Sequence, residues 1–434
     1  TSLKIAETIA GKGKSVLFLV PSLSLLSQSL TEWTQESGIP LASFAVCSDG
    51  DIGKKRDKSD EDVETFMHEL RYPATTDAKR LYLSVTMRHA DDHMTVVFAT
   101  YHSIEVIHQA QRLGMPAFDL ILCDEAHRTT GSTFAGQEDS PFVRVHNAAY
   151  IQGAKRLYMT ATPRIFGEKA KGTADVVLFG MDDESLYGKE LFVLNFSEAV
   201  SRGLLVDYKV VVLTVSAEDI EGKLAGRFGA SDLNVVADDA AKIVGCWKAL
   251  AKHGLTKDET DDSEYMKRAV AFCQVIAPST AKGKHKVSSM NIADMFQRVV
   301  EAYQEAESEK EGGDTTSLIC EARHVDGGMN ATQKETHLVW LKEQAPENTC
   351  RILSNVRCLS EGVDVPSLDA VLFLTPRNSQ IDVVQSVGRV MRLAPGKQRG
   401  YIILPVVIPA GVTPEDALSD NKTYSVVWDV LQAL

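Results

Sequence analysis

The chain has 434 residues, of which 44% are hydrophobic and 24% are charged, and its formal net charge is −13 at pH 7. A chain of this length and composition can bury sizeable cores, which predicts two domains with connecting segments. The acidic balance excludes a protein that coats nucleic acid through bulk electrostatics. A narrow groove, in which backbone amides, hydroxyls and a few local Lys or Arg side chains grip phosphates, remains compatible with it.

No apolar stretch approaches the roughly 20 residues that a membrane-spanning helix requires, and no signal-peptide pattern opens the sequence. We therefore expect no membrane partner and a cytoplasmic location. The cysteines have no Cys-x-x-Cys spacing and several lie in apolar runs, which predicts reduced core residues rather than disulfides or zinc ligands. They are Cys47, Cys123, Cys246, Cys273, Cys320, Cys350 and Cys358.

Helix-like and strand-like segments alternate along the first half of the chain. Residues 2–10 have apolar side chains at helical spacing, and Gly11 and Gly13 follow as stop signals. Such alternation predicts a mostly parallel sheet with helices on both faces. The predicted strands are 16–20, 41–46, 95–99, 118–123 and 156–159.

After a Gly- and charge-rich passage at 167–189 the same pattern resumes, with a predicted helix at 290–305. The sequence therefore predicts an α/β fold of two tandem lobes, 1–205 and 206–410, with a cleft between them. Residues 411–434 would form a C-terminal helix or begin a coupling domain. Polar tracts at 48–64, 253–264 and 305–316 are expected to be solvated loops or insertions. The predicted strands of the second lobe are 208–213, 270–274, 319–324, 351–355, 370–374 and 401–404.

An apolar run that begins at Phe118 ends in Asp124 and Glu125, and Ala126 and His127 follow at once. Such a run predicts a buried strand whose carboxyl end opens onto a ligand crevice. There the first acid can hold Mg²⁺ through its water shell, and the second can polarise the water that attacks a γ-phosphate. The alternative is a strand that merely ends in surface acids.

Small polar residues follow other predicted strands of the first lobe. Because ligands bind at strand ends in a doubly wound sheet, these residues suit phosphate contacts or coupling between sites. The alternative is that they cap the helices that begin there. In chain order they are Pro21, Ser22, Gln28, Thr100, Ser103, Thr160 and Thr162.

Two segments of the second lobe carry a further signal. Residues 360–366 form a Gly-containing turn with Asp364, and residues 385–392 hold Arg389 and Arg392, which a helix would present on one face. A guanidinium that reaches across a cleft can neutralise charge on a transferring phosphoryl group. The alternative is a pair of arginines in surface salt bridges.

Together these segments resemble the superfamily two helicases and translocases of the DEAH-box kind. Residues 124–127 match motif II, 160–162 motif III, 360–366 motif V and 385–392 motif VI. The resemblance covers essentially the whole chain and implies two RecA-like lobes, with ATP between them and nucleic acid across their upper face.

The resemblance also implies roles for individual residues. Asp124 would be the Mg²⁺ acid, acting through water, and Glu125 would be the base beside the same metal. His127 would couple the ATP site to motif VI and to Thr160 and Thr162 of motif III, and Arg389 and Arg392 would be arginine fingers. Further residues implied to bind ATP are Gly362, Asp364, Gln385 and Gly388. Candidate contacts to the nucleic-acid backbone are Pro21, Ser22, Gln28, Thr100, Ser103, Gly327 and Ser354.

Within that superfamily, residues 15–33, 73–77, 124–131 and 354–362 look like the single-polypeptide Type I (Type ISP) restriction-modification proteins. Type I and Type III motor subunits are more distant. In that family the motor sits between a nuclease and a methyltransferase with its target-recognition domain. The resemblance therefore implies a piece of a larger protein that moves along double-stranded DNA at the expense of ATP. Rival hypotheses are a DNA repair or RNA helicase that separates strands, and a catalytically inactive paired-lobe module that binds nucleic acid.

Two segments imitate ligand sites. Residues 11–15 end in Gly-Lys-Ser like a phosphate-binding loop, but Thr8 stands where its first glycine belongs, and the segment follows a predicted helix and opens a predicted strand. We therefore expect the chain to begin just after that loop, and residues 1–434 alone to bind ATP poorly and hydrolyse little. His89 and His93 are spaced as in a zinc helix, but Ala90 replaces the glutamate of that pattern, so we expect no metal there.

Overall fold

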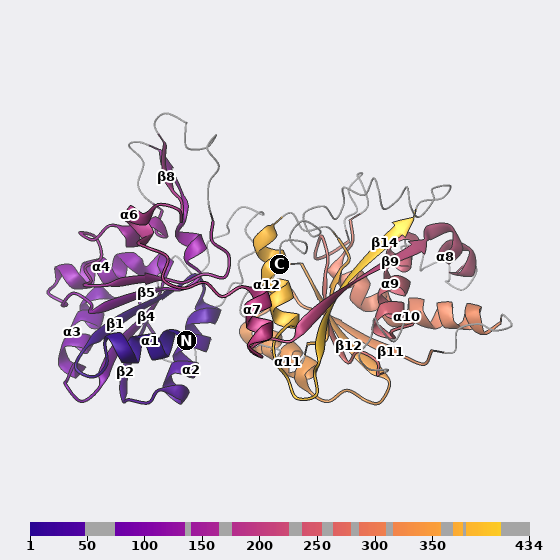
Figure 1. The fold of residues 1–434 in the computed structure, drawn as a ribbon, viewed down its shortest axis with the longest axis horizontal. Helices are drawn as coiled ribbons and strands as arrows, with labels where there is room; N and C mark the ends of the chain where they lie inside the picture. Colours follow the sequence, from indigo (N-terminus) through magenta and orange to yellow (C-terminus); the bar gives the residue numbers. More distant parts are fainter. Residues whose placement is uncertain are drawn as a thin grey trace. The chain divides into compact units, whose positions relative to one another are not determined.

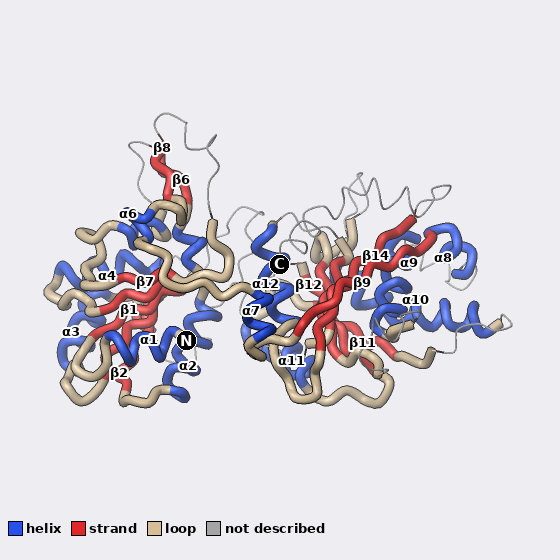
Figure 2. Tube along the Cα trace, viewed as in Figure 1, coloured by secondary structure: helices blue, strands red, loops and turns tan. Residues whose placement is uncertain are grey.

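The computed structural model describes residues 1–47, 74–134, 140–164, 176–224, 237–253, 264–278, 286–309, 316–356, 368–375 and 379–408. It divides the chain into two compact units, Thr1–Val193 and Leu194–Leu434. Each unit contains one six-stranded sheet flanked by helices (Figures 1 and 2). This confirms the predicted α/β fold of two tandem RecA-like lobes.

The sheet of the first unit has the strand order β3-β2-β4-β1-β5-β7, and every neighbouring pair is parallel. β1 and β4 lie at its centre, where β4 is buried along its whole length. This explains why both read as continuous apolar runs, since a parallel strand between two helical layers has no solvent face. The strands are β1 (Ser15–Val20), β2 (Leu41–Val46), β3 (Ala74–Thr75), β4 (Met94–Thr100), β5 (Leu120–Cys123) and β7 (Arg156–Tyr158).

Helices cover both faces of this sheet. α1 (Ser2–Ile9) and α2 (Leu23–Glu36) pack on one face through a core that includes Trp33, and α3 (Ala78–Arg88) and α4 (Ile104–Arg112) pack on the other. A two-stranded antiparallel sheet, β6 (Gly131–Phe134) and β8 (Val176–Phe179), accompanies them. The short helical segments are η3 (Tyr101–Ser103), η4 (Ala126–Thr129), η5 (Val143–His146) and α6 (Glu184–Tyr187).

The second unit repeats the plan with the strand order β11-β12-β10-β13-β14-β9, again parallel throughout. Because all the strands run the same way, their carboxyl ends lie at one edge of the sheet, where ligands bind in such folds. The strands are β9 (Asp207–Ser216), β10 (Arg268–Phe272), β11 (Ile319–His324), β12 (Thr349–Asn355), β13 (Ala370–Phe373) and β14 (Arg399–Ile408).

Two helical layers enclose this second sheet, as Figure 2 shows. One contains α8 (Ala217–Leu224), α9 (Ala237–Leu250) and α10 (Ser289–Ser308), with Trp247 fully buried in its core. The other contains α11 (Ala331–Lys342) and α12 (Gln380–Val390). Each layer therefore buries one face of the sheet, as in the first unit.

The division between the units falls earlier in the chain than the predicted boundary at residue 205. Phe196 and Val200 of α7 (Phe196–Ser201) pack with Leu205 against the core under α12, and the Val206 amide donates to the Met391 carbonyl at 2.8 Å. The segment 194–205 thus belongs with the second unit because its apolar side chains find their core there.

Gly400, near the start of β14, lies directly under the end of α12. A methyl group at this position would overlap the carbonyl oxygen of Val390, the last residue of the helix. Only glycine allows the strand and the helix end to approach so closely. The position of α12 is therefore tied to the backbone of its own sheet.

Each strand predicted from the sequence is present, with ends that differ by a few residues. The short strands β3, β6 and β8 were not predicted. None of the helices in the described ranges is long and apolar enough to cross a membrane. The predicted loop at 48–64 and the segment 411–434 lie outside the described residues, as do parts of the tracts 253–264 and 305–316.

Candidate functional site

Asp124 and Glu125 follow β5 directly, at the carboxyl edge of the first sheet. The amide of Asp124 donates to the carbonyl of Leu19 at 2.9 Å, which continues the pairing of β5 with β1. Glu125 then has a left-handed backbone, with φ 47° and ψ 46°. This conformation is uncommon for a residue other than glycine and clusters at functional sites. It ends the strand abruptly and begins η4, which carries His127.

The environment of Asp124 disfavours its charged form. Burial and the neighbouring charge of Glu125 raise the pKa of Asp124 to about 6, although the Glu125 amide donates to its carboxylate at 3.0 Å. Two adjacent carboxylates in a partly buried position repel one another, and a divalent cation would relieve that repulsion. The donor set of Asp124 and Glu125 therefore fits Mg²⁺, which prefers carboxylate oxygens and water.

His127 joins the turn after β5 to the turn after β7. Its Nδ1 lies 3.0 Å from Thr160 Oγ1 and 3.4 Å from Thr162 Oγ1. The same nitrogen is 3.3 Å from Glu125 Oε2, while only 5% of the His127 side chain is exposed. The structure thus brings together four residues predicted to form motifs II and III, and places the histidine between the proposed base and the two threonines.

Tyr101, which follows β4, supports the acidic turn from the far side of β1. This tyrosine is fully buried, and its hydroxyl donates to the Asp124 carbonyl at 2.8 Å. Burial raises its pKa well above the usual value, so it stays neutral and remains a donor. Thr100 and Ser103 lie on either side, both buried, with their hydroxyl oxygens 2.7 Å apart. The two hydroxyls therefore bond to one another in this structure. A side chain that contacts the nucleic-acid backbone, as predicted for both residues, would instead face solvent.

The segment after β1 remains compatible with a role at the surface. Ser22 is half-buried and caps α2, accepting from the Leu25 amide at 3.3 Å, and Pro21 before it is buried. Gln28 lies on α2, where its amide nitrogen donates to Glu32 Oε1 at 2.7 Å. Ser22 therefore caps a helix, which was the alternative to a phosphate contact, while the side chain of Gln28 is on the partly exposed face of α2.

The Gly-Lys-Ser segment at 11–15 lies at the opposite edge of the sheet from Asp124. It follows α1 and opens β1, as the sequence predicts. Its amides are already used, since Gly11 donates to the Ala6 carbonyl at 3.1 Å and Gly13 to the His93 carbonyl at 2.8 Å. Lys14 forms an ion pair with Asp119 at 3.1 Å. These contacts assign the segment to the end of a helix and the start of a strand.

In the second unit, Arg389 and Arg392 are not on one helix. α12 holds Arg389 in its last turn but ends at Val390, and Arg392 pairs as an isolated β-bridge with Leu205. The prediction that one helix presents both is therefore wrong, because a segment far away in the sequence pairs with the chain at Arg392. Gln385 and Gly388 are on α12, where Gly388 faces the ring of Phe196. Gly362 and Asp364 lie outside the described residues.

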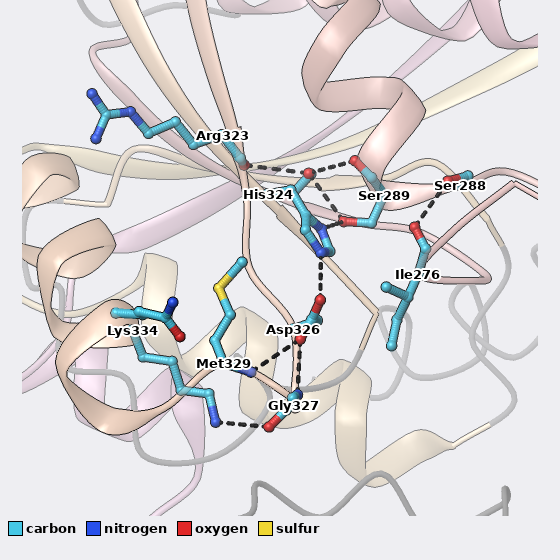
Figure 3. A network of polar contacts seen from close by, with 12 residues as sticks. Ile276, Ser288, Ser289, Arg323, His324, Asp326, Gly327, Met329 and Lys334 are labelled. Atoms are coloured by element: carbon cyan, nitrogen blue, oxygen red, sulfur yellow. Dashed lines mark hydrogen bonds and ion pairs between the residues drawn. The ribbon is translucent and has the colours of Figure 1, made fainter.

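Gly327, labelled in Figure 3, and Ser354 of β12 have different surroundings at the carboxyl edge of the second sheet. Gly327 is in the turn between β11 and α11, and no atom lies within 4 Å of the place that a Cβ would take. Ser354 is fully buried near the end of β12, and its hydroxyl donates to the Ser289 carbonyl at 2.8 Å. A side chain at Gly327 would thus meet open space, whereas the side chain of Ser354 is part of the internal structure.

An aromatic cluster behind η4 was not predicted from the sequence. His146 Nε2 lies 3.2 Å from the Thr129 carbonyl and Nδ1 lies 3.0 Å from the Tyr158 hydroxyl, while Tyr187 reaches Thr129 Oγ1 at 3.0 Å. A carbonyl only accepts, so Nε2 carries the proton and Nδ1 accepts from Tyr158. Burial lowers the pKa of His146, which agrees with this neutral form. These residues are far apart in the sequence and form no motif, so only the fold reveals them.

Comparisons with known proteins agree with this geometry. Residues 1–165 match the family model "Type III restriction enzyme, res subunit", and residues 292–394 match "Helicase conserved C-terminal domain". A probable helicase of African swine fever virus is 26% identical over 406 residues, which are 94% of this chain and 37% of the viral protein. A putative helicase of Sulfolobus islandicus filamentous virus is 23% identical over 286 residues, 66% of this chain and 42% of that protein.

Two solved structures are similar over the whole chain. The ATP-dependent Type ISP restriction-modification enzyme LlaBIII bound to DNA is 40% identical with a TM-score of 0.78, and this chain covers 27% of its length. A nuclease-deletion mutant of the Type ISP enzyme LlaGI, in complex with a DNA substrate mimic, is 31% identical with a TM-score of 0.57, and this chain covers 26% of it. The chain therefore spans about a quarter of the length of these two enzymes.

Proposed function

Because this chain is a helicase-like motor of the kind found in Type ISP restriction-modification enzymes, we propose that it couples ATP hydrolysis to movement along double-stranded DNA. The observation that carries the proposal is the turn after β5, where Asp124 and Glu125 lie beside His127 and its contact to Thr160. The parent protein would add a nuclease, a methyltransferase and a target-recognition domain, and would work in the cytoplasm.

The residues of the turn divide the chemical work. Asp124 would hold Mg²⁺ through water, and this ion would neutralise charge on the phosphates of ATP. Glu125 would orient the attacking water and polarise it. His127 lies between the two, with Nδ1 3.3 Å from Glu125 Oε2 and 3.0 Å from Thr160 Oγ1, and would link the base to the loop after β7. A shift of that loop would then change the position of the base.

We further propose that Arg389 and Arg392 of the second unit act on the same nucleotide. A guanidinium beside the γ-phosphate stabilises the charge that spreads over the phosphoryl oxygens in the transition state. Gly362, Asp364, Gln385 and Gly388 would support nucleotide binding in the same motifs. Closure on ATP and reopening after hydrolysis would give the alternating grip that movement requires.

DNA is the proposed partner, because both similar enzymes were solved with DNA or its mimic. Contacts through the backbone at Gly327 and the residues after β1, Pro21, Ser22 and Gln28, would hold phosphates and carry no sequence information. Within each unit, the buried hydroxyls of Thr100 and Ser103 or of Ser354 would support these contacts from the interior. An acidic chain is compatible with such a grip, since it needs only local donors.

The test is Glu125→Gln in the intact protein that contains this chain. We expect ATP turnover in the presence of duplex DNA to fall by at least about a hundredfold, the range typical of a lost general base, with ATP affinity unchanged. Glu301→Gln, on the exposed face of α10, is the matched control and should keep full turnover. Unchanged turnover in the Glu125 variant would show that Glu125 is not the general base.

A second measurement separates the proposed motor from its rivals. Stimulation of turnover by duplex DNA, single-stranded DNA and RNA is compared in the intact protein, together with displacement of a third strand from a DNA triplex. Stimulation by duplex DNA with triplex displacement supports a translocase. Unwinding of a forked duplex, or stimulation by RNA alone, would favour a strand-separating helicase, and binding without any turnover would favour an inactive module.

Residues 1–434 alone are a separate case. Because the segment at 11–15 uses its amides internally and lies at the wrong edge of the sheet, we propose that it does not cradle phosphates. ATP hydrolysis by these residues alone should then be weak. Robust turnover would show that another part of the chain supplies the phosphate contacts.

A further inference from the structure

Four buried or half-buried side chains form a continuous chain of hydrogen bonds at the carboxyl edge of the second sheet (Figure 3). His324, the last residue of β11, lies 2.7 Å from Ser289 Oγ through Nδ1 and 2.8 Å from Asp326 Oδ2 through Nε2. Ser289 in turn bonds to Ser354 Oγ at 3.0 Å. The contacts join the first turn of α10, the end of β11 and the end of β12.

The direction of each bond follows from the number of protons available. Ser354 uses its single proton toward the Ser289 carbonyl at 2.8 Å, so it accepts from Ser289 Oγ. Because the Asp326 carboxylate only accepts, Nε2 of His324 donates to it. Nδ1 of the same ring lies against the Ser289 hydroxyl, so His324 joins the buried serines to the carboxylate.

Asp326 links His324 to the turn between β11 and α11. While its Oδ2 faces His324, its Oδ1 accepts from the Gly328 amide at 2.8 Å and the Met329 amide at 3.2 Å. Lys334 of α11 holds the same turn from the other side, donating to the Gly327 carbonyl at 3.0 Å. The turn at Gly327, a half-buried residue, is therefore fixed by a carboxylate whose own orientation depends on His324.

We propose that His324 is a positioning residue that, through Asp326, holds the turn at Gly327 in place for contact with the DNA backbone. The proposal rests on the function proposed above, since it concerns the same grip. His324 touches no phosphate itself in this scheme. Its effect is to let the second sheet carry a rigid contact point, instead of a turn whose backbone reorients with each binding event.

The two amide replacements of His324 separate its two bonds. The amide nitrogen of glutamine takes the place of Nε2 and can still donate to Asp326, whereas that of asparagine takes the place of Nδ1 and reaches only Ser289. In the intact protein, we expect His324→Asn to raise the DNA concentration that half-stimulates ATP turnover by about tenfold, the size expected from one lost bond to a charged group. His324→Gln should stay close to the unchanged protein.

Turnover at saturating DNA should be the same in both variants, because the ATP site is not altered. Glu301→Gln, on the exposed face of α10, is the control and should leave DNA stimulation unchanged. Equal weakening by both His324 variants, or loss of turnover at saturating DNA, would overturn the proposal.

Hydrogen exchange gives a readout that needs no DNA. In His324→Asn the peptide that covers the Gly328 and Met329 amides should exchange about tenfold faster, and in His324→Gln it should not. Unchanged exchange in the asparagine variant would overturn the relay even if DNA stimulates turnover. If DNA fails to stimulate the unchanged protein, the proposed function falls, and the exchange experiment alone then supports or overturns the relay.

Discussion

Thr160 Oγ1 lies 3.0 Å from His127 Nδ1, so the loop after β7 is bonded to the acidic turn after β5. Thr162 is a second, more distant partner of the same nitrogen, at 3.4 Å. The Thr160 hydroxyl also accepts from the Thr162 amide at 3.1 Å. One hydroxyl therefore organises its own loop and orients the histidine beside the proposed base.

Thr160→Val tests this link. Because the variant keeps the shape of the side chain and removes the hydroxyl's bonds to His127 and to the Thr162 amide, we expect DNA-stimulated ATP turnover to fall by at least about tenfold. Thr162→Val, the matched control, should lose less, since its contact is longer. A double-mutant cycle with His127→Ala should be strongly non-additive. Additive losses would show that the two residues act independently.

The pKa of Asp124 predicts how the first unit responds to pH. Burial and the charge of Glu125 raise the pKa of Asp124 to about 6. Above that pH the folded protein therefore holds an ionised carboxylate, which lowers the free energy of unfolding. This destabilisation disappears as the pH falls from about 6 toward 4, because the carboxyl group then becomes protonated in the folded protein. Asp124→Asn should therefore stabilise the nucleotide-free protein at pH 8, on the order of 1–3 kcal/mol, and by progressively less below pH 6.

Thermal unfolding without nucleotide or divalent cation, measured from about pH 4 to pH 8, checks this expectation against the usual carboxyl range. A stability difference that does not change with pH would contradict the raised pKa. Asp124→Asn should also abolish Mg²⁺-dependent ATP turnover, because the carboxylate that lowers stability is the one proposed to bind Mg²⁺ through water.

His146 should stabilise the end of η4, the short helical segment that follows Glu125. His146→Phe keeps an aromatic ring in the cluster but leaves the Thr129 carbonyl and the Tyr158 hydroxyl without their partner. We expect a loss of about 1–3 kcal/mol in stability, the usual cost of unsatisfied buried polar groups. Tyr158→Phe removes only one of the two bonds and should cost less. Chemical denaturation of both variants gives the comparison, and a larger loss in the Tyr158 variant would contradict it.

Gly400→Ala should disturb the second unit strongly. The added methyl group would overlap backbone atoms of Val390, which cannot move aside as a side chain can, so strand and helix must separate. We expect a loss of roughly 1–3 kcal/mol, the cost typical of overpacking. Gly222→Ala, on α8 with no atom within 4 Å of the added carbon, is the control and should be neutral or slightly stabilising. Equal thermal stability of the two variants would contradict the close approach at Gly400.

Most of the fold was predictable because its central strands, such as β1, β4, β10 and β13, are buried on both faces and read as continuous apolar runs. β3, β6 and β8 escaped detection since they have between two and four residues each and depend on partners far away in the sequence. The boundary between the units was misplaced for the same reason, because Phe196 and Leu205 are assigned by the core they enter.

The acidic turn was predictable because a parallel sheet gathers the carboxyl ends of its strands. The sequence predicts Asp124, His127 and Thr160 at the carboxyl edge of the first sheet, and the structure has them there. It did not reveal that the hydroxyls of Thr100 and Ser103 are buried and bonded to each other, since small polar residues at strand ends serve ligands and internal contacts alike. The end of α12 before Arg392 depends on a bridge to Leu205, which no local pattern encodes.

The contact between Gly400 and Val390 also limits how Arg389 can move. Since α12 rests on the backbone of β14 with no space for even a methyl group, sliding this helix along its sheet would drive peptide groups into one another. The last turn of α12, which carries the Arg389 backbone, should therefore move together with β14 as one body.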